Sequence, residues 1–394
     1  MARARANLDA IEVLSGHANE DEPHLTEPER ETLARYVGWG GTPKVMETLA
    51  RAEQFLASNV ETSRVRQMLA PSQGEERADL AMRYIDMRET GVIPDHQVAQ
   101  MRRSTLNAHY TAPGIVRSVW AAVERLGFTE GRVIEPGVGT GNFFGLIPES
   151  IKPNAELHGV ELDSTTARIA QSLYPDASIE NTGFENFRAP PGSYDLAIGN
   201  VPFGNYTVAD PDYDKYRANI HNHFLLKSLD LVQPGGVVAL LTSSFTLDAG
   251  SNKIRRFLAE RGDLLAAVRL PQRAFAKNAN TDVNIDVLLF QRVENRPDML
   301  DRPDEDMPLW ARPAIDLNAE YDEREKPSYV SPYFHAHPEH VIGEIVEASS
   351  RFNPHDHVVR ASAEEIEAIP ERLEKIWESA LPEGVYAPAH GPFN

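Results

Sequence analysis

A glycine-rich stretch, Glu135-Pro136-Gly137-Val138-Gly139-Thr140-Gly141-Asn142-Phe143, separates a short β-rich run from the start of a helical run. Glycines at such a turn let the backbone approach a ligand closely, and the helix start offers free N–H groups. The glycine spacing does not complete the Gly-x-Gly-x-x-Gly fingerprint of dinucleotide-binding proteins. No lysine follows where a phosphate-binding loop requires one, which argues against a nucleoside triphosphate site.

Short β-rich runs alternate with helical runs around this stretch. The β-rich runs are Arg132–Glu135, Leu157–Glu161, Tyr194–Ile198, Val237–Leu241, Leu264–Val268 and Ile285–Phe290. The helical runs are Pro113–Leu126, Ser164–Leu173, Asn222–Val232 and Asn252–Glu260. Such alternation predicts an α/β fold, in which a mostly parallel sheet carries helices on both faces. In sheets of this kind, ligands bind beyond the carboxyl ends of the strands.

Acidic residues end the first two β-rich runs. Glu161 ends the second run, where a carboxylate accepts hydrogen bonds from the ribose hydroxyls of a dinucleotide or of S-adenosylmethionine. Glu135 stands directly before the glycines, where a negative charge would repel a pyrophosphate. S-adenosylmethionine has no phosphate and carries an ammonium and a sulfonium. Glu135 therefore favours this methyl donor over a dinucleotide as the cofactor.

The composition of the 394 residues excludes several classes of protein. Lys and Arg total 39 and Asp and Glu total 59, so the formal net charge is −20, which argues against tight binding of nucleic acid by bulk electrostatics. The absence of cysteine excludes disulfides, thiolate zinc sites and cysteine nucleophiles. No apolar run approaches the ~20 residues that a membrane helix needs, and no secretory signal is present. We therefore expect a soluble cytoplasmic protein that does not bind a membrane.

Three regions follow from the patterning of the chain. We expect a helical N-terminal region over residues 1–104, the α/β domain over 105–293, and an acidic linker with a helical C-terminal extension over 294–394. The stretch Asp298–Lys326 is rich in acidic residues and proline, and is expected to be solvated and partly extended. Helices are expected after it, around Val341–Ala348 and Ala363–Ser379.

The fourth β-rich run leads into Asn200-Val201-Pro202-Phe203. This tetrapeptide resembles the signature Asn-Pro-Pro-Tyr of the amino-methyltransferases of DNA. The exocyclic amine of adenine is a poor nucleophile because its lone pair is delocalised into the ring, and hydrogen bonds to acceptors free that lone pair. The resemblance makes the Asn200 side-chain oxygen and the Val201 carbonyl these acceptors. It implies that Pro202 stiffens the loop and that Phe203 faces an extruded base.

Further elements occur in the order found in the γ-type adenine methyltransferases and the type I modification subunits, which they resemble. Tyr110-Thr111-Ala112-Pro113 matches an element that folds over the methionine part of the cofactor, and Gly183-Phe184-Glu185 matches one that holds its adenine. Leu270-Pro271-x-x-x-Phe275 matches a late motif. The residues implied in cofactor binding are Tyr110, Thr111, Pro113, Glu135, Pro136, Gly137, Gly139, Gly141, Asn142, Phe143, Glu161, Leu162, Glu185 and Asn200.

Three other runs, Tyr36–Gly41, His221–Phe224 and Tyr333–Glu339, carry a narrower resemblance. They look like the methyltransferase part of the helicase–methyltransferase fusions of phages and plasmids, some of which are linked to anti-restriction. No helicase motif occurs in this chain. It is therefore either a stand-alone relative or one that works with a separate helicase or specificity partner.

The resemblance implies a Rossmann-like, seven-stranded methyltransferase fold and methylation of the N6 amino group of adenine in DNA. The setting implied is restriction-modification, phage defence or anti-restriction. Two alternatives stay open. The acceptor could be RNA or a protein glutamine, because amide nitrogens pose the same problem of a delocalised lone pair. The chain could also be a catalytically degenerate, cofactor-binding scaffold, because Val201 replaces the first proline of the signature.

Three further features of the sequence are candidates for a functional site. The histidines near Pro332 and Pro338 are interpreted as part of a loop, so no metal site is expected. The stretch Asp210–Lys215 resembles a loop over the active site, and would either hold the target strand or be an exposed insertion. The basic stretch is interpreted either as a site for the DNA backbone or as a solvated helix face; its cations are Lys253, Arg255, Arg256, Arg261, Arg269, Arg273 and Lys277.

Overall fold

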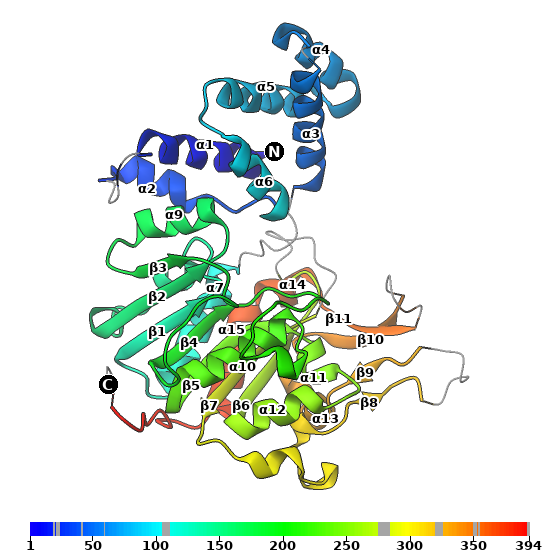
Figure 1. Cartoon of the computed structure of the whole chain (residues 1–394). Helices are drawn as coiled ribbons and strands as arrows, with labels where there is room; N and C mark the ends of the chain where they lie inside the picture. Colours follow the sequence, from blue (N-terminus) through cyan, green and yellow to red (C-terminus); the bar gives the residue numbers. More distant parts are fainter. Residues whose placement is uncertain are drawn as a thin grey trace.

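The computed structural model describes residues 1–18, 20, 24–40, 42–58, 60–104, 111–274, 284–319, 326–349, 353 and 355–391. Its centre is a seven-stranded sheet (Figure 1). In sheet order the strands are β3 (Ser178–Asn181), β2 (Ala155–Glu161), β1 (Gly131–Pro136), β4 (Tyr194–Asn200), β5 (Val232–Ser243), β7 (Ile285–Arg292) and β6 (Gly262–Leu270). Only β7 runs antiparallel to its neighbours. The predicted mostly parallel, Rossmann-like sheet is confirmed.

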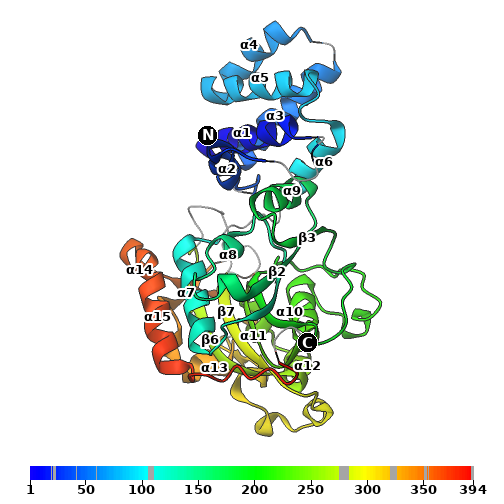
Figure 2. The same ribbon diagram turned by 90° about the vertical axis from the view of Figure 1, so that its left-hand side faces the viewer.

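Helices cover both faces of this sheet, as the alternating pattern predicts. On the central strands, Val133 and Leu196 join the core on one face, whereas their neighbours Ile134 and Ala197 join the core on the other. Helices α7 (Pro113–Arg125) and α15 (Ile369–Ala380) pack on the first face. Helices α10 (Ile220–Leu231) and α12 (Lys253–Arg261) pack on the second (Figure 2). Because both faces are covered, the central strands are continuous apolar runs.

The N-terminal region is helical, as predicted, and lies over the β3 edge of the sheet (Figure 1). It contacts α9 (Ser164–Leu173), where Gln97 Nε2 donates to Thr165 Oγ1 at 3.1 Å and Ile169 joins the core of the N-terminal helices. Trp39 is fully buried in that core. The helices are α1 (Ala2–Gly16), α2 (Glu27–Ala34), α3 (Pro43–Ala57), α4 (Thr62–Gln73), α5 (Glu75–Glu89) and α6 (Asp95–Ser104).

The C-terminal region corrects one of the predicted helices. Residues Val341–Ala348 contain no helix: β10 (Glu344–Ala348) forms a hairpin with β11 (Asp356–Arg360). Val341 bridges Arg269 of β6, and the Ile342 N–H donates to the Arg269 carbonyl at 2.9 Å. Pairing with a distant strand thus overrides the local helical pattern. The other predicted helix is present, as α14 (Ala363–Glu367) followed by α15.

The acidic linker is folded over its described part, although its acidic residues at 298, 301 and 304–306 are exposed, as expected of a solvated segment. Residues 297–311 form three short 3-10 turns, and Met299, Met307 and Trp310 are buried. Arginines of α12 hold this segment: Arg256 Nη1 donates to the Arg302 carbonyl at 2.6 Å, and Arg255 Nη2 donates to the Arg312 carbonyl at 3.0 Å. The linker is therefore folded onto α12 by side-chain hydrogen bonds that local composition does not reveal.

The same contacts correct both interpretations for three of the seven cations of the basic stretch. Arg255, Arg261 and Arg269 are each at most 5% exposed, so they form neither a DNA-binding surface nor a solvated helix face, whereas Lys253 and Arg273 are exposed. Arg261 donates to Asp230 and to the Tyr216 hydroxyl, and Arg269 lies between buried carboxylates. Lys277 lies outside the described residues. These arginines serve the interior of the fold.

The remaining short elements complete the described part of the chain. These are α8 (Asn142–Gly145), α11 (Phe245–Asp248), α13 (Pro332–Ala336), the strand β8 (Ile315–Asp316) and its partner β9 (Tyr329–Val330). No helix among the described residues is both long enough and apolar enough to cross a membrane.

Candidate functional site

The glycine-rich loop lies at the carboxyl end of β1 and is tied to β2. The backbone N–H groups of Gly137 and Val138 both donate to the Val160 carbonyl, at 2.9 and 3.0 Å. Gly137, Gly139 and Gly141 have φ values of 74°, 58° and 81°, in the left-handed region that favours glycine. A side chain at Gly139 would meet nothing within 4 Å, so this glycine borders open space. The loop thus exposes backbone at the carboxyl edge of the sheet.

Two carboxylates flank this open space, as the sequence predicts. Glu135, at the end of β1, is 3% exposed, and its pKa is raised well above the usual range by burial and by the charge of Glu161. Glu161, at the end of β2, accepts from the N–H groups of Gly139 at 3.0 Å and Asp163 at 2.8 Å. Burial raises the pKa of Glu161 to about 7. Both carboxyl groups are therefore protonated more readily than exposed ones.

The tetrapeptide follows β4, the neighbour of β1 in the sheet. Asn200 Nδ2 donates to Thr111 Oγ1 at 3.1 Å, which joins the catalytic candidate to the segment before α7. The Val201 N–H donates to the Leu241 carbonyl of β5 at 3.1 Å, which fixes the peptide that follows Asn200. A side chain at Gly137 would contact Pro202 at 3.8 Å, so the glycine loop and the tetrapeptide lie side by side. Phe203 is partly buried.

The other predicted site residues differ in their exposure and in whether the side chain or the backbone lies beside the glycine loop. Thr111 is 4% exposed and Pro113 opens α7. The Phe143 side chain lies in the core, so only its backbone borders the loop. Leu162, after β2, is 69% exposed, and Glu185 lies in the loop after β3 with its carboxylate against Gly183. Pro136 ends β1, and Asn142 opens α8 behind Gly141. Tyr110 and Phe275 lie outside the described residues.

Gly199 is a site residue that the sequence analysis did not single out. A Cβ at this position would lie 3.1 Å from Glu135 Cγ, so the bare backbone of β4 gives the Glu135 side chain its space. The sequence does carry a signal for this role, because Gly199 continues an apolar β-rich run and stands directly before Asn200. Glycine within a strand marks a place where another group approaches the backbone closely.

We predict that Gly199→Ala weakens S-adenosylmethionine binding about tenfold, because the added methyl group pushes the Glu135 carboxyl group from its position. Calorimetry with the purified variant measures this loss. Gly16→Ala is the matched control, since a Cβ there meets nothing within 4 Å. An affinity of the Gly199 variant equal to that of the control would contradict this role for Glu135.

The carboxyl groups beside the glycine loop fit the proposed cofactor. Among the described residues, no hydrogen-bond partner reaches Glu135 Oε2, although the atom is buried. A buried carboxyl group with an unpaired oxygen suits a cationic ligand, because a nearby ammonium group lowers the pKa of the carboxyl group and so favours its ionised form. Glu161 can accept from hydroxyl groups, and open space beside Gly139 allows close approach. The residues present therefore suit a ligand that has an ammonium group and a ribose and lacks phosphate.

The raised pKa of Glu161 predicts a pH-dependent affinity. Ribose hydroxyls need the ionised carboxylate as their acceptor, and that form gains population as the pH rises through about 7. We expect S-adenosylmethionine to bind about tenfold more tightly at pH ~8 than at pH ~6. Calorimetry across this range tests the expectation. Glu161→Gln should flatten the profile; an unchanged profile in this variant would assign the titration to another group.

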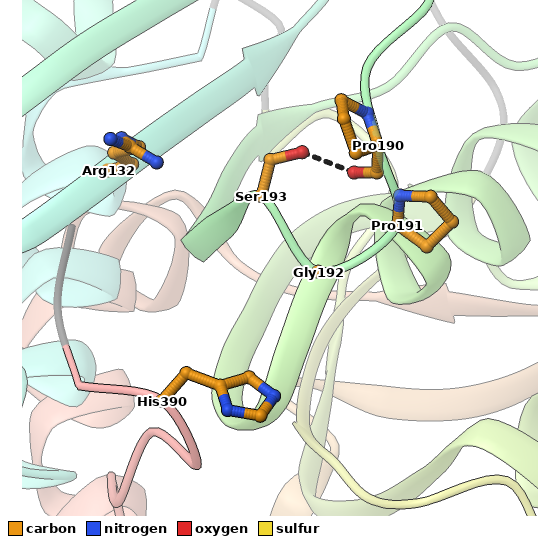
Figure 3. Close-up of a pocket in the computed structure, with 6 residues that line it drawn as sticks. All are labelled: Arg132, Pro190, Pro191, Gly192, Ser193 and His390. Carbon is orange, nitrogen blue, oxygen red and sulfur yellow. Dashed lines mark hydrogen bonds between the residues drawn. The ribbon is translucent and has the colours of Figure 1, made fainter. Parts of the chain in front are cut away.

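One pocket lies away from this site. It has a volume of about 650 Å³ and is lined by Arg132 at the start of β1, by residues 190–193 before β4, and by His390 (Figure 3). These positions lie at the amino ends of β1 and β4, opposite the glycine loop and the tetrapeptide. Ligands of open parallel sheets bind at the carboxyl ends. Geometry and chemistry together favour the carboxyl edge, and not this pocket, as the functional site.

Three residues near the C-terminus form a cluster that the sequence analysis interpreted as a loop. His337, Glu339 and His340 offer ligand atoms within 4.8 Å of one another, and His337 Nδ1 contacts Glu339 Oε1 at 3.1 Å. Burial lowers the pKa of His340, whose Nδ1 lies 2.8 Å from the Tyr333 hydroxyl. The cluster is explained by hydrogen bonds among its own members. The absence of a metal site stays a prediction.

Comparison with known proteins relates about half of the chain to curated proteins. It is 31% identical over 196 residues to the defense against restriction protein B of Escherichia phage P1, an alignment covering 48% of this chain and 8% of that protein. It is 28% identical over 206 residues to the type II methyltransferase M.XamI of Xanthomonas campestris pv. amaranthicola, covering 46% and 38%. Most of both relatives therefore lies outside the matched part.

A less similar relative carries the name of an RNA methyltransferase. The rRNA N(6)-adenosine-methyltransferase of Caenorhabditis elegans is 24% identical over 184 residues, covering 44% of this chain and 81% of that protein. A solved type I restriction-modification methyltransferase subunit from Streptococcus thermophilus superposes with a TM-score of 0.42 at 16% identity, covering 75% and 79%. No protein-family model matches the chain. Over about half of its length the chain is thus a sequence relative of a phage defense-against-restriction protein and of a type II methyltransferase, and its own sheet is Rossmann-like.

Proposed function

We propose that this protein methylates the N6 amino group of adenine in DNA, with S-adenosylmethionine as the methyl donor. The observation that carries the proposal is the placement of Asn200-Val201-Pro202-Phe203 at the carboxyl end of β4, against the glycine loop of β1. The two loops are neighbours, because a Cβ at Gly137 would lie 3.8 Å from Pro202. The names of the phage and Xanthomonas relatives support a role in restriction-modification or anti-restriction.

The residues of this chain would act by positioning. Thr111 accepts from the Asn200 amide nitrogen, which directs the amide oxygen to the other side of the group, where it can accept from an amino N–H. The Val201 carbonyl would be a second acceptor, and Val201 is held in place because its own N–H donates to the Leu241 carbonyl. Two acceptors on one amino group favour a pyramidal nitrogen with an available lone pair. Holding that nitrogen in line with the methyl group is the main catalytic device.

When bound, S-adenosylmethionine would supply an electrophilic methyl group on a sulfonium. The amino nitrogen held by Asn200 and Val201 would accept this methyl group and release one proton to water. An adenine in duplex DNA must leave the base stack to reach Asn200, and the Phe203 ring offers a face for it. With a net charge of −20, the chain is expected to bind DNA weakly by itself, so a partner protein would supply sequence choice.

The experiment is methyl transfer from labelled S-adenosylmethionine to unmethylated DNA, with RNA and protein substrates run in parallel. We expect label in N6-methyladenine from DNA. Label only in RNA would favour the acceptor named in the Caenorhabditis relative, and label in glutamine would favour a protein substrate. Cofactor binding without transfer to any acceptor would favour the scaffold. Each of these three results would contradict the proposed substrate.

A further inference from the structure

A buried ion pair joins two loops at the carboxyl edge of the sheet. Asp210, in the loop between the tetrapeptide and α10, has a side chain that is 0% exposed, and the Lys227 side chain on α10 is 5% exposed. Lys227 Nζ donates to Asp210 Oδ2 at 2.9 Å and to the Phe184 carbonyl at 2.7 Å. Phe184 belongs to the loop after β3. One ammonium group therefore contacts both loops.

The surroundings of this ammonium are specific. His223, one helical turn before Lys227, contacts Asp210 Oδ2 through Nε2 at 3.0 Å. Arg188, in the loop after β3, lies 3.4 Å from Asp210 Oδ1. The ammonium also faces the rings of Phe184 and Tyr213, at 5.2 and 5.7 Å from their centroids. Asp210 is thus the point at which α10 and the loop after β3 hold the loop that follows the tetrapeptide.

The two loops carry different parts of the site. The loop after β3 contains Glu185, next to Phe184, and Arg188 Nη1 donates to the Glu185 carbonyl at 2.6 Å. The other loop runs from Phe203 to Asp210, and its residues 205–207 are exposed. Lys227 lies between them, bonded to Phe184 in one loop and to Asp210 in the other. It is therefore placed to transmit the position of one loop to the other.

Stability alone does not account for such a pair. Burying a lysine and an aspartate costs desolvation energy, and apolar residues of similar size often stabilise a fold equally well. Further contacts also anchor the segment that follows Asp210. Tyr213 donates to Asp230 at 3.0 Å, and the Tyr216 hydroxyl accepts from Arg261 at 2.6 Å. The ion pair between Lys227 and Asp210 is therefore not the sole anchor of the turn after Asp210.

We propose that Lys227 and Asp210 are positioning residues that couple the loop after β3 to the loop after the tetrapeptide. Occupation of the cofactor site would thereby order the stretch between Phe203 and Asp210, against which the target base is placed. The proposal rests on the proposed function only for the identity of that target. The coupling itself concerns cofactor binding and loop order, and both are measurable without an acceptor.

Hydrogen exchange with and without S-adenosylmethionine tests the coupling. In the wild-type chain, we expect the cofactor to protect amides of residues 183–188 and also of 204–210. In Lys227→Met, protection should persist near the glycine loop and fall at least about threefold over 204–210. Lys215→Met is the matched control, because Lys215 is an exposed lysine in the short 3-10 turn between Asp210 and α10. Equal protection of 204–210 in the two variants would overturn the proposal.

A second variant separates positioning from folding. Removing one partner leaves a buried charge unpaired, so Lys227→Met alone can lose stability. The double variant Asp210→Leu/Lys227→Met removes both charges and should unfold near the wild-type temperature. It should nevertheless lose cofactor-induced protection of 204–210, and kcat for the acceptor should fall about tenfold or more with little change in the Kd of S-adenosylmethionine.

Two outcomes of this variant overturn the inference: cofactor-induced protection like that of the wild type, or wild-type kcat at any stability. The failure of the proposed function looks different. In that case the wild-type chain transfers no methyl group to DNA, while the exchange experiment still reports whether the two loops are coupled.

Discussion

Asn200→Ala is expected to abolish methyl transfer while leaving S-adenosylmethionine binding nearly intact. The change removes the side-chain acceptor and leaves the backbone of β4, the glycine loop and both carboxylates in place. Loss of one preorganised polar group at a reacting centre costs about 100-fold or more in kcat. Transfer of labelled methyl groups measures the loss, and calorimetry measures the retained affinity for the cofactor.

Two further variants sharpen this test. Asn154→Ala removes an exposed asparagine from the turn before β2 and should keep full activity. Asn200→Asp keeps an acceptor oxygen but loses the donor to Thr111, so its activity should lie between those of wild type and the alanine variant. Methyl transfer retained by the Asn200→Ala variant would contradict the proposed mechanism, because the Asn200 side chain would then not be needed to activate the amino group.

Arg269→Met is expected to cost the fold about 3–5 kcal/mol, because it leaves buried carboxylates without their cation. The Arg269 side chain, on β6, is 3% exposed and contacts Asp286 on β7 at 2.8 Å and Asp248 on α11 at 2.7 Å. Its guanidinium also lies over the Phe334 ring, 4.2 Å from the centroid. Chemical denaturation of the variant measures the loss in the free energy of unfolding.

The matched control for this variant is Arg35→Met. Arg35 pairs with Glu31 across one helical turn, and both side chains are more than half exposed. Exposed pairs contribute about 0–1 kcal/mol, so this variant should be nearly as stable as wild type. If the two substitutions cost the same, Arg269 does not act as the buried counter-ion that its contacts indicate.

These two variants compare a buried arginine, which neutralises carboxylates inside the fold, with an exposed arginine, whose ion pair contributes little stability. The basic stretch looked like a surface for DNA because a sequence shows the number of cations and not their exposure. In the structure, Arg255, Arg261 and Arg269 are in the interior, where they hold the acidic segment, Asp230 and the carboxylates beside β6. The proposed DNA substrate is therefore best sought at the carboxyl edge, near the exposed Tyr206 and Phe245.

The α/β architecture was predictable because its signals are local. A two-sided sheet needs strands that are apolar on both faces, and each such run is legible within a few residues. The glycine loop, Glu135, Glu161 and the tetrapeptide were found in the same way, since each stands directly after a predicted strand. The parallel sheet then brings the ends of neighbouring strands together, so the placement of these residues at one edge follows from topology.

Other features depended on partners far away in the sequence. The helical pattern of Val341–Ala348 gave way to strand pairing, because Val341 and Ile342 bond to Arg269 of β6. The need for glycine at position 199 comes from Glu135, on another strand. No local pattern could reveal either contact, since each is made by segments that only the folded chain brings together.

The sequence by itself determined the fold class, the type of cofactor that fits and the motif expected to act on the acceptor. Only the tertiary structure decided which charges are buried and what they join. It placed Asp210 beside Lys227 and Phe184, and Arg269 between Asp248 and Asp286. The physical reason is that a buried charge is stable only with its partners in place, and those partners come from distant segments whose proximity is a property of the packed fold.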